Sequence, residues 1–483
     1  MRHPLLNDRD LAFLETRGIS PEEAVRQLQL LENGVRAPVL SRAATVGDGI
    51  VRCPVEELDA LLPQFDGAAG CGEVGFFVPA SGAASRMFAG PAQLLAHTHP
   101  DPQAESIRLR RLAQAPVVHR NLWDKGVDPE DAEGIARLLV KDPPEGYGWA
   151  GRPKAFVPFH EDPEPSFPLR TPLVEQIAES AEILGKAGRG TVHFTLAEGW
   201  PLPAQFDETC RALGRRHGGD VVAGASLQSP STDTLSLESD GTLVRDQDGR
   251  PALRAGGHGS LLANLSMTPG KVVLVKNIDN IQPDARRPYV VPWRRRLGAL
   301  ALALRTRSDR FLSGGSSQEL RDLAARTGVR LPEADGELRE LVDRPLRVAG
   351  MVPNVGEPGG GPFWVVGERG ERLEIVEQSE IDPSQKGLIS GSTHFNPVEL
   401  ACCLDRADGT RRSLDSFVDP SRAFLSKKPS PRGDLRVFER PGLWNGAMSG
   451  WWTVFLEIPL DTFLPAKTVH DLAHPWRLET DRA

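Results

Sequence analysis

The stretch VGFFVPASGAASRMF, which extends from Val74 to Phe88, decides the expected fold. Its first part, residues 74–79, is a short continuous apolar run, which predicts a strand buried on both faces, as in a parallel sheet. A run of small residues, 80–85, follows that strand, and Arg86 comes directly after it. The sequence thus places a loop with very small side chains at the carboxyl end of a predicted buried strand.

Two physical reasons could keep this loop small. A tight strand-to-helix turn needs small residues for close packing. A phosphate site needs them because backbone N–H groups can approach an anion only where side chains are small, and a helix N-terminus adds its dipole. Arg86 would then offer a planar set of donors to phosphate oxygens. The loop contains neither a GK[ST] sequence nor GxGxxG, since Gly82 stands alone.

Strands and capped helices alternate along the first two thirds of the chain, which predicts an α/β fold with a mainly parallel, Rossmann-like sheet flanked by helices. After about residue 340 the pattern becomes β-rich, with Gly and Pro turns between short apolar runs. We therefore expect an N-terminal helical segment (1–70), an α/β domain (71–340) with a helical insertion at about 90–150, and a smaller β-rich C-terminal region (341–483). Two further buried strands are expected at TVHFTLA (191–197) and KVVLVKNID (271–279).

The expected helices carry recognisable start signals. Ser20 is placed to cap the segment 20–34, with Pro21 at the first helical position and Glu23 closing a capping box. Residues 102–142 look helical, and Asp128 with Pro129 is expected to cap the last of these helices. The segment 171–188 has Thr171 as its N-cap and apolar residues at helical spacing, so it should lie on a core.

The predicted strand 271–279 delivers Asp279 at its carboxyl end. Ligands of open α/β sheets bind in the crevice outside the carboxyl ends of the strands. The small loop 80–85 follows one such strand and Asp279 ends another, so the two are expected to converge on one crevice.

The overall composition excludes several classes of protein. The chain has 483 residues, a net charge of −8 and 40% hydrophobic residues, which favours a folded protein without a general nucleic-acid or anionic-membrane partner. No CxxC pair is present, so a zinc framework is not indicated. The 5 cysteines are an odd number, so they cannot all pair in disulfides within the chain. The charged N-terminal stretch is unlike a secretory leader, and no apolar run is long enough to span a bilayer. We therefore expect a cytoplasmic protein.

The order of motifs resembles the GT-A-type nucleotidyltransferases, especially the sugar pyrophosphorylases. Those enzymes have a glycine-rich loop ending in arginine, a P-K motif with a PLVE helix, a GGNG-like turn and a strand ending in N-x-D-N. The corresponding stretches here are PASGAASRMF (79–88), PKAFVPF (153–159) with TPLVEQI (171–177), GGHG (256–259) and NIDN (277–280). IVEQSEI (375–381) and THFNPVEL (393–400) resemble downstream motifs of UDP-sugar pyrophosphorylases. Taken whole, the chain is identified as a member of the bacterial family DUF4301.

This resemblance implies a transfer of a nucleotide from a nucleoside triphosphate, such as UTP, to a sugar 1-phosphate, with release of pyrophosphate. It implies that Lys154, Arg86 and Asp279 act in catalysis, with Asp279 also holding Mg²⁺, which prefers oxygen ligands. It also implies a set of substrate-binding residues in the loop, the glycine-rich turn, the NIDN motif and FLSKKPSPRG: Ser81, Gly82, Ala83, Ser85, Gly256, Gly257, His258, Gly259, Asn280, Lys427 and Lys428.

The sequence departs from the family pattern in the loop, which has one glycine where sugar pyrophosphorylases have two or three. Ala83 and Ala84 stand at the missing positions, and His258 lies between the glycines of the GGHG turn. A nucleotide- or sugar-phosphate-binding protein without turnover therefore stays an alternative, because fold alone does not separate the two. A glycosyltransferase is the other alternative, and its D-x-D motif could only be DRD (8–10) or DQD (246–248).

Other constellations favour structural roles. His470 and His474 have the spacing of two zinc ligands, but no third ligand is near in the sequence. Cys402 and Cys403 are expected to be core thiols. The arginine-rich segment 292–307 is interpreted as a solvated helix face, and Trp451 and Trp452 as residues that pack a β-core.

Overall fold

The computed structural model describes residues 3–162, 169–356, 360–367, 370–428, 430 and 433–478. The chain divides into two compact units, each assembled from separate segments. Unit 1 comprises Met1–Leu61, Gln228–Val272 and Ala299–Ile458, and unit 2 comprises Leu62–Leu227, Val273–Gly298 and Pro459–Ala483. Each unit is described by itself below.

Four strands of unit 2 lie side by side in one sheet, in the order β10-β4-β7-β8. Strands β4, β7 and β8 run parallel, with Phe77 opposite His193 and His193 opposite Gly224. Strands β4 and β10 are almost wholly buried because they consist of apolar runs, as a parallel sheet covered on both faces requires. The strands of this unit are β4 (Val74–Pro79), β7 (Arg189–Leu196), β8 (Asp220–Leu227), β10 (Val272–Lys276), and the short pair β5 (His160–Glu161) and β6 (Leu169–Arg170).

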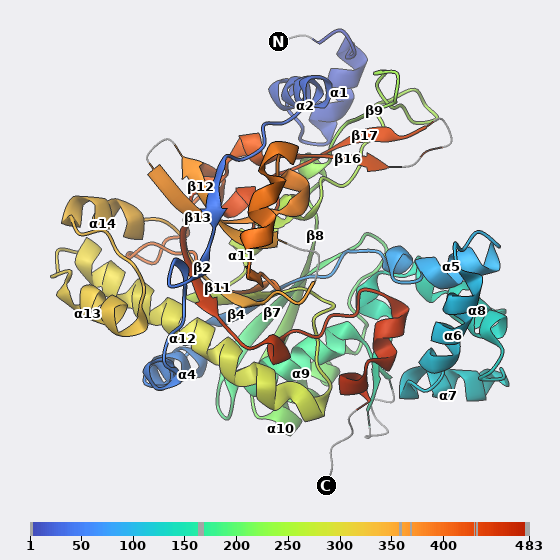
Figure 1. Ribbon diagram of the computed structural model, residues 1–483, viewed down its shortest axis with the longest axis horizontal. Helices are drawn as coiled ribbons and strands as arrows, with labels where there is room; N and C mark the ends of the chain where they lie inside the picture. The colour runs from blue at the N-terminus through green and yellow to red at the C-terminus, as the bar shows by residue number, and fades with distance from the viewer. Residues whose placement is uncertain are drawn as a thin grey trace. The chain divides into compact units, whose positions relative to one another are not determined.

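Helix α9 (Pro172–Leu184) packs on this sheet with α10 (Phe206–His217), and both contact β8 (Figure 1). Its first residue is Pro172, as predicted, and Gly185 follows its end with φ +68. Thr171 occupies the N-cap position, but its side chain accepts no hydrogen bond there. Nearly every residue of α9 is buried, including Glu175, Gln176 and Glu179, so this helix brings charged groups into the interior.

Four helices, α5 to α8, lie between the loop and Lys154 in the sequence and form a cluster (Figure 1). Its apolar core includes residues of the loop region and of the C-terminal segment, such as Met87, Ala466 and Val469. The C-terminal segment is therefore fixed to this insertion by burial. The helices of unit 2 before α9 are α4 (Leu62–Gly70), α5 (Ala89–Leu95), α6 (Pro102–Leu112), α7 (Pro116–Lys125) and α8 (Ala132–Val140).

Unit 1 carries a sheet segment with the order β2-β3-β18-β11-β15. Strands β3, β18 and β11 are parallel, and β15 is antiparallel to β11. Strand β14 also pairs with β11. These strands are β2 (Thr45–Val46), β3 (Gly49–Val51), β11 (Leu346–Pro353), β14 (His394–Phe395), β15 (Glu399–Cys403) and β18 (Trp452–Glu457).

Two smaller antiparallel sheets complete the β structure of unit 1, in the orders β1-β12-β13 and β16-β17-β9. Their strands are β1 (Leu40–Ala43), β9 (Ser236–Leu237), β12 (Gly360–Gly367), β13 (Gly370–Glu377), β16 (Phe424–Lys428) and β17 (Leu435–Glu439). The helices of the unit are α1 (Asp8–Thr16), α2 (Pro21–Asn33), α3 (Val55–Asp59), α11 (Leu262–Met267), α13 (Gln318–Thr327) and α14 (Asp335–Val342). The long helix α12 (Arg287–Leu312) begins in unit 2 and ends in unit 1.

The predicted fold class is confirmed: the protein is mixed α/β, with mostly parallel central strands, surrounding helices and a β-rich C-terminal part. Two details of the helix starts were wrong. Helix α8 is capped by Asp131, whose side chain accepts from the Gly134 amide, and not by Asp128 and Pro129. The Ser20 hydroxyl accepts from the Glu23 amide, but the Glu23 carboxylate binds Arg26 and Gln27 instead of closing a capping box.

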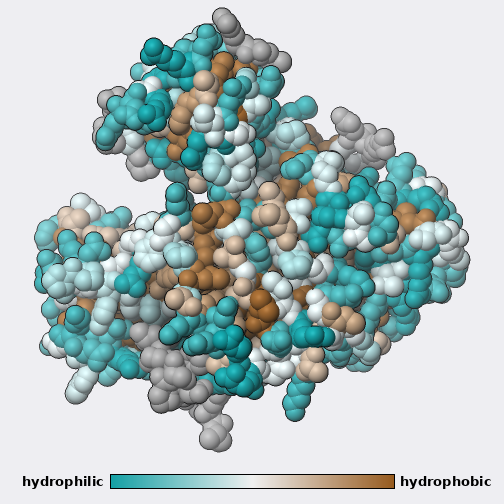
Figure 2. Space-filling view, turned by 180° about the vertical axis from the view of Figure 1, so that it is seen from behind, coloured by the Kyte–Doolittle hydropathy of each residue, from teal (hydrophilic) through white to brown (hydrophobic). Residues whose placement is uncertain are grey.

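The face shown in Figure 2 is mostly hydrophilic, with small separate apolar patches. None of the helices among the described residues is long and apolar enough to cross a membrane. Among these residues, several large apolar side chains are more than half exposed: Ile107, Trp123, Val222, Leu227, Met267, Tyr289 and Val355.

Candidate active site

The small-residue loop after β4 combines buried and exposed positions. Ala80 and Ala84 are completely buried, so packing explains their small size. Gly82, Ala83 and Ser85 are exposed, and Ser81 is half-buried. A Cβ atom built on Gly82 would meet no heavy atom within 4 Å. Packing therefore does not explain why residue 82 is a glycine, and the exposed face of the loop borders open space.

Backbone hydrogen bonds join this loop to the P-K motif. The amide of Lys154 donates to the Gly82 carbonyl at 2.9 Å, and the amide of Ala84 donates to the Arg152 carbonyl at 2.9 Å. Ala83 and Pro153 form an isolated antiparallel bridge. The chain segment before the helical insertion therefore contacts the segment after it. This places Lys154 beside the loop although the two are far apart in the sequence.

Lys154 and Asp279 form an ion pair at this position. The Lys154 Nζ donates to the Asp279 Oδ2 at 2.8 Å and to the Ala466 carbonyl at 3.1 Å. The two side chains are 15% and 20% exposed, so solvent and a ligand can reach both. The prediction that Asp279 ends the strand was wrong. Strand β10 stops at Lys276, and Asp279 lies in the turn that follows it.

A C-terminal segment, which the sequence analysis did not single out, also contacts the residues around Asp279 and the loop. The Ala466 amide donates to the Asp279 carbonyl at 3.0 Å, and the Val469 amide donates to the Met87 carbonyl at 3.0 Å. Asn280, expected to bind substrate, is buried and accepts from the Leu464 amide at 2.9 Å. The C-terminal segment takes part in all three contacts through its backbone amides, so no side-chain pattern in that segment could have indicated them.

Arg86 ends the short 3₁₀ helix Ala84–Arg86 and is exposed. Its guanidinium makes no hydrogen bond or ion pair with any residue in the described part of the chain. A guanidinium offers five N–H donors. Arg86 is therefore an uncompensated cation directly after the exposed face of the loop.

A buried charge cluster fixes the strand that leads to Asp279. The Lys276 Nζ lies 2.8 Å and 2.9 Å from the two oxygens of Glu179, and the Arg294 Nη1 lies 2.8 Å from Oε1. Burial opposes ionisation of Glu179, but the charges of Lys276 and Arg294 outweigh it and lower the pKa of this carboxyl. The cluster ties β10 to α9 and to the first part of α12, so the turn with Asp279 starts from a rigid base.

The GGHG residues lie in unit 1, where His258 is held on several sides. Its ring stacks on Trp444 with centroids 4.3 Å apart, and its Nδ1 accepts from the Leu443 amide at 3.0 Å. Its Nε2 lies 3.6 Å from Glu377 Oε1. Burial opposes ionisation of Glu377, yet its contact with His258 lowers the pKa of the carboxyl.

The three glycines of this turn, unlike Gly82, are closely surrounded by other protein atoms. A Cβ atom on Gly256 would lie 2.5 Å from the Thr232 carbonyl, and one on Gly259 would lie 2.0 Å from the Pro441 carbonyl. Gly257 has φ +76, and its Cβ would lie 2.9 Å from a Glu439 oxygen. Neighbouring protein therefore occupies the space that side chains here would need.

Lys427 and Lys428 also lie in unit 1, on β16. Lys427 is exposed, whereas the Lys428 Nζ lies 3.5 Å from Glu439 Oε1. The structure thus brings Arg86, the loop, Lys154 and Asp279 together within unit 2. The GGHG residues and the two lysines belong to unit 1, and the site predicted from both groups stays a prediction.

Two further motifs have structural roles. His470 pairs with Glu105 at 2.9 Å, and His474 accepts from the Trp476 amide, so the two histidines do not share a ligand position. Cys402 and Cys403 are buried, and burial raises the pKa of both thiols. In the described residues, no group of three or more His, Cys, Asp or Glu side chains is placed to hold a metal ion.

Comparison with known proteins adds the family. The sequence matches the domain of unknown function DUF4301 over residues 7–476. The chain belongs to the DUF4301 family. The membership of DUF4301 expected from the motifs is thereby confirmed, and it assigns no activity. No curated protein matches the sequence.

Solved structures similar to this DUF4301 chain include two from Trypanosoma brucei. A uridine diphosphate N-acetylglucosamine pyrophosphorylase is 13% identical, with a TM-score of 0.48, and the match covers 96% of this chain and 79% of the other. A UDP-glucose phosphorylase is 11% identical, with a TM-score of 0.45, over 96% of this chain and 76% of the other. At this level of similarity, the two structures say nothing about activity.

Proposed function

We propose that this protein is a nucleotidyltransferase that joins a nucleoside triphosphate to a sugar 1-phosphate and releases pyrophosphate. The observation that carries the proposal is the Lys154–Asp279 pair at 2.8 Å, held beside a loop whose exposed face is free of bulk. The loop and Arg86 fit phosphate oxygens, since exposed backbone N–H groups and a planar guanidinium are both anion donors. The motif resemblance supports the same assignment.

The chemistry requires little beyond position and charge. The attacking phosphate oxygen of the sugar phosphate is already ionised, so no strong base is needed. The oxygen forms a new bond to the α-phosphorus while the bond to the leaving pyrophosphate breaks. Lys154 would stabilise the negative charge that develops on the α-phosphate, and Arg86 with the loop amides would hold the β- and γ-phosphates.

The donor set at Asp279 fits Mg²⁺ in one specific way. In the described part of the chain, Asp279 belongs to no group of three or more His, Cys, Asp or Glu side chains, whereas a resident metal site would need several protein ligands. Mg²⁺ is commonly bound by one or two carboxylates together with substrate phosphates and water. The residues present therefore fit an ion that arrives with the triphosphate, where it would neutralise phosphate charge.

Pyrophosphate release, measured with a panel of nucleoside triphosphates and sugar 1-phosphates, tests the proposal. We expect release that requires both substrates and Mg²⁺. Saturable triphosphate binding without release would favour the alternative, a binding protein that lacks turnover. If no triphosphate binds or reacts, the assignment of the site is wrong.

Asp279→Asn is expected to abolish the Mg²⁺-dependent part of triphosphate binding and to lower turnover about a hundredfold or more, because the amide carries no negative charge. Thermal unfolding with the triphosphate, with and without Mg²⁺, measures this, since a ligand of the native state raises the midpoint. Asp124→Asn, an exposed position on α7, is the matched control. An equal Mg²⁺ effect in Asp279→Asn and wild type would remove Asp279 from the site.

Ala83→Val is expected to weaken triphosphate binding about tenfold or more, since a branched side chain beside Gly82 would occupy space needed by phosphates. The backbone at Ala83 is extended (φ −66, ψ 146), which valine adopts readily, so the unfolding free energy should change by only about 0.5 kcal/mol. Titration calorimetry measures the affinity, with the exposed Ala204→Val as the control. Unchanged affinity in Ala83→Val would mean that the loop is only a packing turn.

A further inference from the structure

Unit 1 contains a cavity of about 580 Å³, whereas the proposed catalytic residues Arg86, Lys154 and Asp279 belong to unit 2. The cavity is lined by β3, the first part of β18, the β12–β13 hairpin, α14 and the segment before α14. Ligand pockets typically enclose about 300–1,000 Å³. The cavity is therefore large enough for a molecule of two fused rings.

Apolar side chains that are only half-buried gather around this cavity. They come from several separate segments of the chain: Val46, Val51, Leu331, Pro332, Leu341, Trp364 and Leu373. Removal of apolar surface from water is favourable in proportion to the area that is covered. An apolar molecule in the cavity would cover the part of these side chains that the protein leaves accessible.

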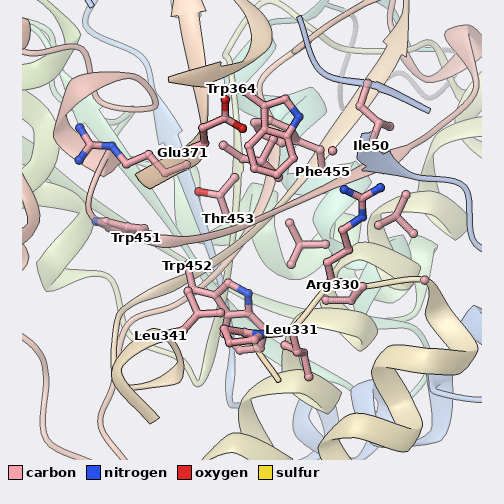
Figure 3. Close-up of a pocket in the computed structure, with 18 of the residues that line it drawn as sticks. Ile50, Arg330, Leu331, Leu341, Trp364, Glu371, Trp451, Trp452, Thr453 and Phe455 are labelled. Atoms are coloured by element: carbon pink, nitrogen blue, oxygen red, sulfur yellow. The ribbon is translucent and has the colours of Figure 1, made fainter. Parts of the chain in front are cut away.

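Aromatic and aliphatic side chains form opposite walls of the cavity. Trp364 and Phe455 lie on one side, and Trp452, Leu331 and Leu341 lie on the other (Figure 3). Aromatic side chains pack against other rings in stacked or edge-to-face arrangements, which add to the effect of burial. Walls of this kind fit a flat aromatic molecule better than a bulky aliphatic one.

The two tryptophans of these walls are held in place by the protein itself. The Trp364 Nε1 donates to the Asp48 carbonyl at 3.3 Å, and the Arg42 guanidinium lies over its ring, 4.9 Å from the centroid. Trp452 is 3% exposed and pairs with Leu346 in the parallel strands β18 and β11. The walls are therefore formed before a ligand arrives, as is usual for small-molecule sites.

Two arginines of the lining are already engaged by carboxylates. The Arg52 Nη2 donates to Glu457 Oε1 at 2.8 Å. The Arg372 Nη2 donates to Asp419 at 3.2 Å, and its Nε donates to Glu374. The positive charge of both arginines is thus balanced within the protein.

The other charged residues of the lining are engaged as well. Glu371 accepts from Arg42 Nη1 at 2.7 Å, and Arg330 lies 3.5 Å from Asp48. Arg344 is not free either. A charged ligand would lose its hydration in the cavity without gaining an uncompensated opposite charge, which is unfavourable. The lining therefore favours a neutral molecule.

We propose that this cavity is a second small-molecule site, which binds a neutral, flat aromatic molecule. Its rings lie between the wall of Trp364 and Phe455 and the wall of Trp452, Leu331 and Leu341. The proposal is independent of the proposed transferase activity, because it concerns different residues and needs only a binding measurement.

Titration calorimetry of the full-length protein with 2-naphthalenemethanol tests this proposal. Two comparison probes separate the effects of charge and shape: 2-naphthoate is flat but anionic, and 1-adamantanemethanol is neutral but bulky. We expect saturable binding of 2-naphthalenemethanol. Each comparison probe should bind about tenfold or more weakly, because the first pays for lost hydration and the second does not fit between facing rings.

Two variants locate the binding in this cavity. Leu341→Trp should fill the cavity and abolish binding of 2-naphthalenemethanol. Leu331→Asp places a carboxylate in the wall and should weaken binding about tenfold or more. Leu331 is half-buried in the segment between α13 and α14, so this second variant should fold even if the first does not.

Val355→Trp is the control, because it adds the same side chain as Leu341→Trp at a position of unit 1 that is 66% exposed and does not line the cavity. It should bind 2-naphthalenemethanol like wild type. Thermal unfolding without a probe shows which variants are folded. The proposal would be overturned by absence of saturable binding in wild type, by equal affinity for either comparison probe, or by undiminished binding in folded Leu341→Trp or Leu331→Asp.

Discussion

Glu179→Ala is expected to lower the free energy of unfolding by about 3–5 kcal/mol, because removal of one partner of a buried ion cluster leaves uncompensated charge. Glu179 is 1% exposed, and it is the shared partner of Lys276 and Arg294. Lys276 is completely buried at the end of β10. Urea denaturation followed by circular dichroism measures the change.

An exposed glutamate provides the control for this result. Glu130 pairs with Arg110 at 3.6 Å, and its side chain is 79% exposed, so Glu130→Ala should cost less than about 0.5 kcal/mol. The pKa of Glu179 is lowered in the folded state, so its contribution is present at neutral pH and is lost as the pH falls through that lowered pKa. A Glu179→Ala protein as stable as wild type would show that the cluster does not hold β10.

Lys154→Ala is expected to lower kcat about a hundredfold or more with the substrate pair found in the panel, because a preorganised charge at the developing transition state is lost. The change in KM should be small by comparison, since Arg86 and the loop amides still hold the β- and γ-phosphates. Steady-state pyrophosphate release separates the two quantities. Lys154 lies at the site edge, 15% exposed, so the variant should keep its fold.

Lys141→Ala, which removes an exposed lysine from the same unit, is the matched control and should react like wild type. Lys154→Arg keeps the charge but replaces a compact ammonium with a planar fork, so it should restore only part of kcat. A change in Lys154→Ala confined to KM would assign Lys154 to substrate binding and contradict its role in the transition state.

The elements of the fold could be predicted because their signals are local. The apolar run 74–79 became β4, and Ser20 with Pro21 marked the start of α2. Side-chain periodicity and caps depend on neighbours a few residues away, which the sequence shows directly. The two errors in the helix starts arose because another nearby residue makes the contact. Asp131 caps α8 in place of Asp128, and the Glu23 carboxylate accepts from Arg26 instead of from the N-cap amide.

The same locality explains which candidate residues could be proposed. The loop 80–85, Arg86, Lys154 and Asp279 were each found next to a strand end or a short motif. Their sequence could not show that Lys154 binds Asp279, because that contact depends on the helical insertion closing on itself. The role of Ala466 is carried by its amide and carbonyl, which every residue type except proline possesses.

The sequence by itself determined the α/β class, the approximate positions of the strands at 74–79, 191–197 and 271–279 and of several helices, and the family. Only the tertiary structure decided that Glu179 joins Lys276 and Arg294, and that Gly82 faces open space while Gly259 faces the Pro441 carbonyl. It also decided that three tryptophans, Trp364, Trp451 and Trp452, line one cavity. The physical reason is that burial, ion pairing and free volume depend on segments far apart in the chain. The residue types of a segment determine its secondary structure, and the packing of distant segments determines which atoms each side chain contacts.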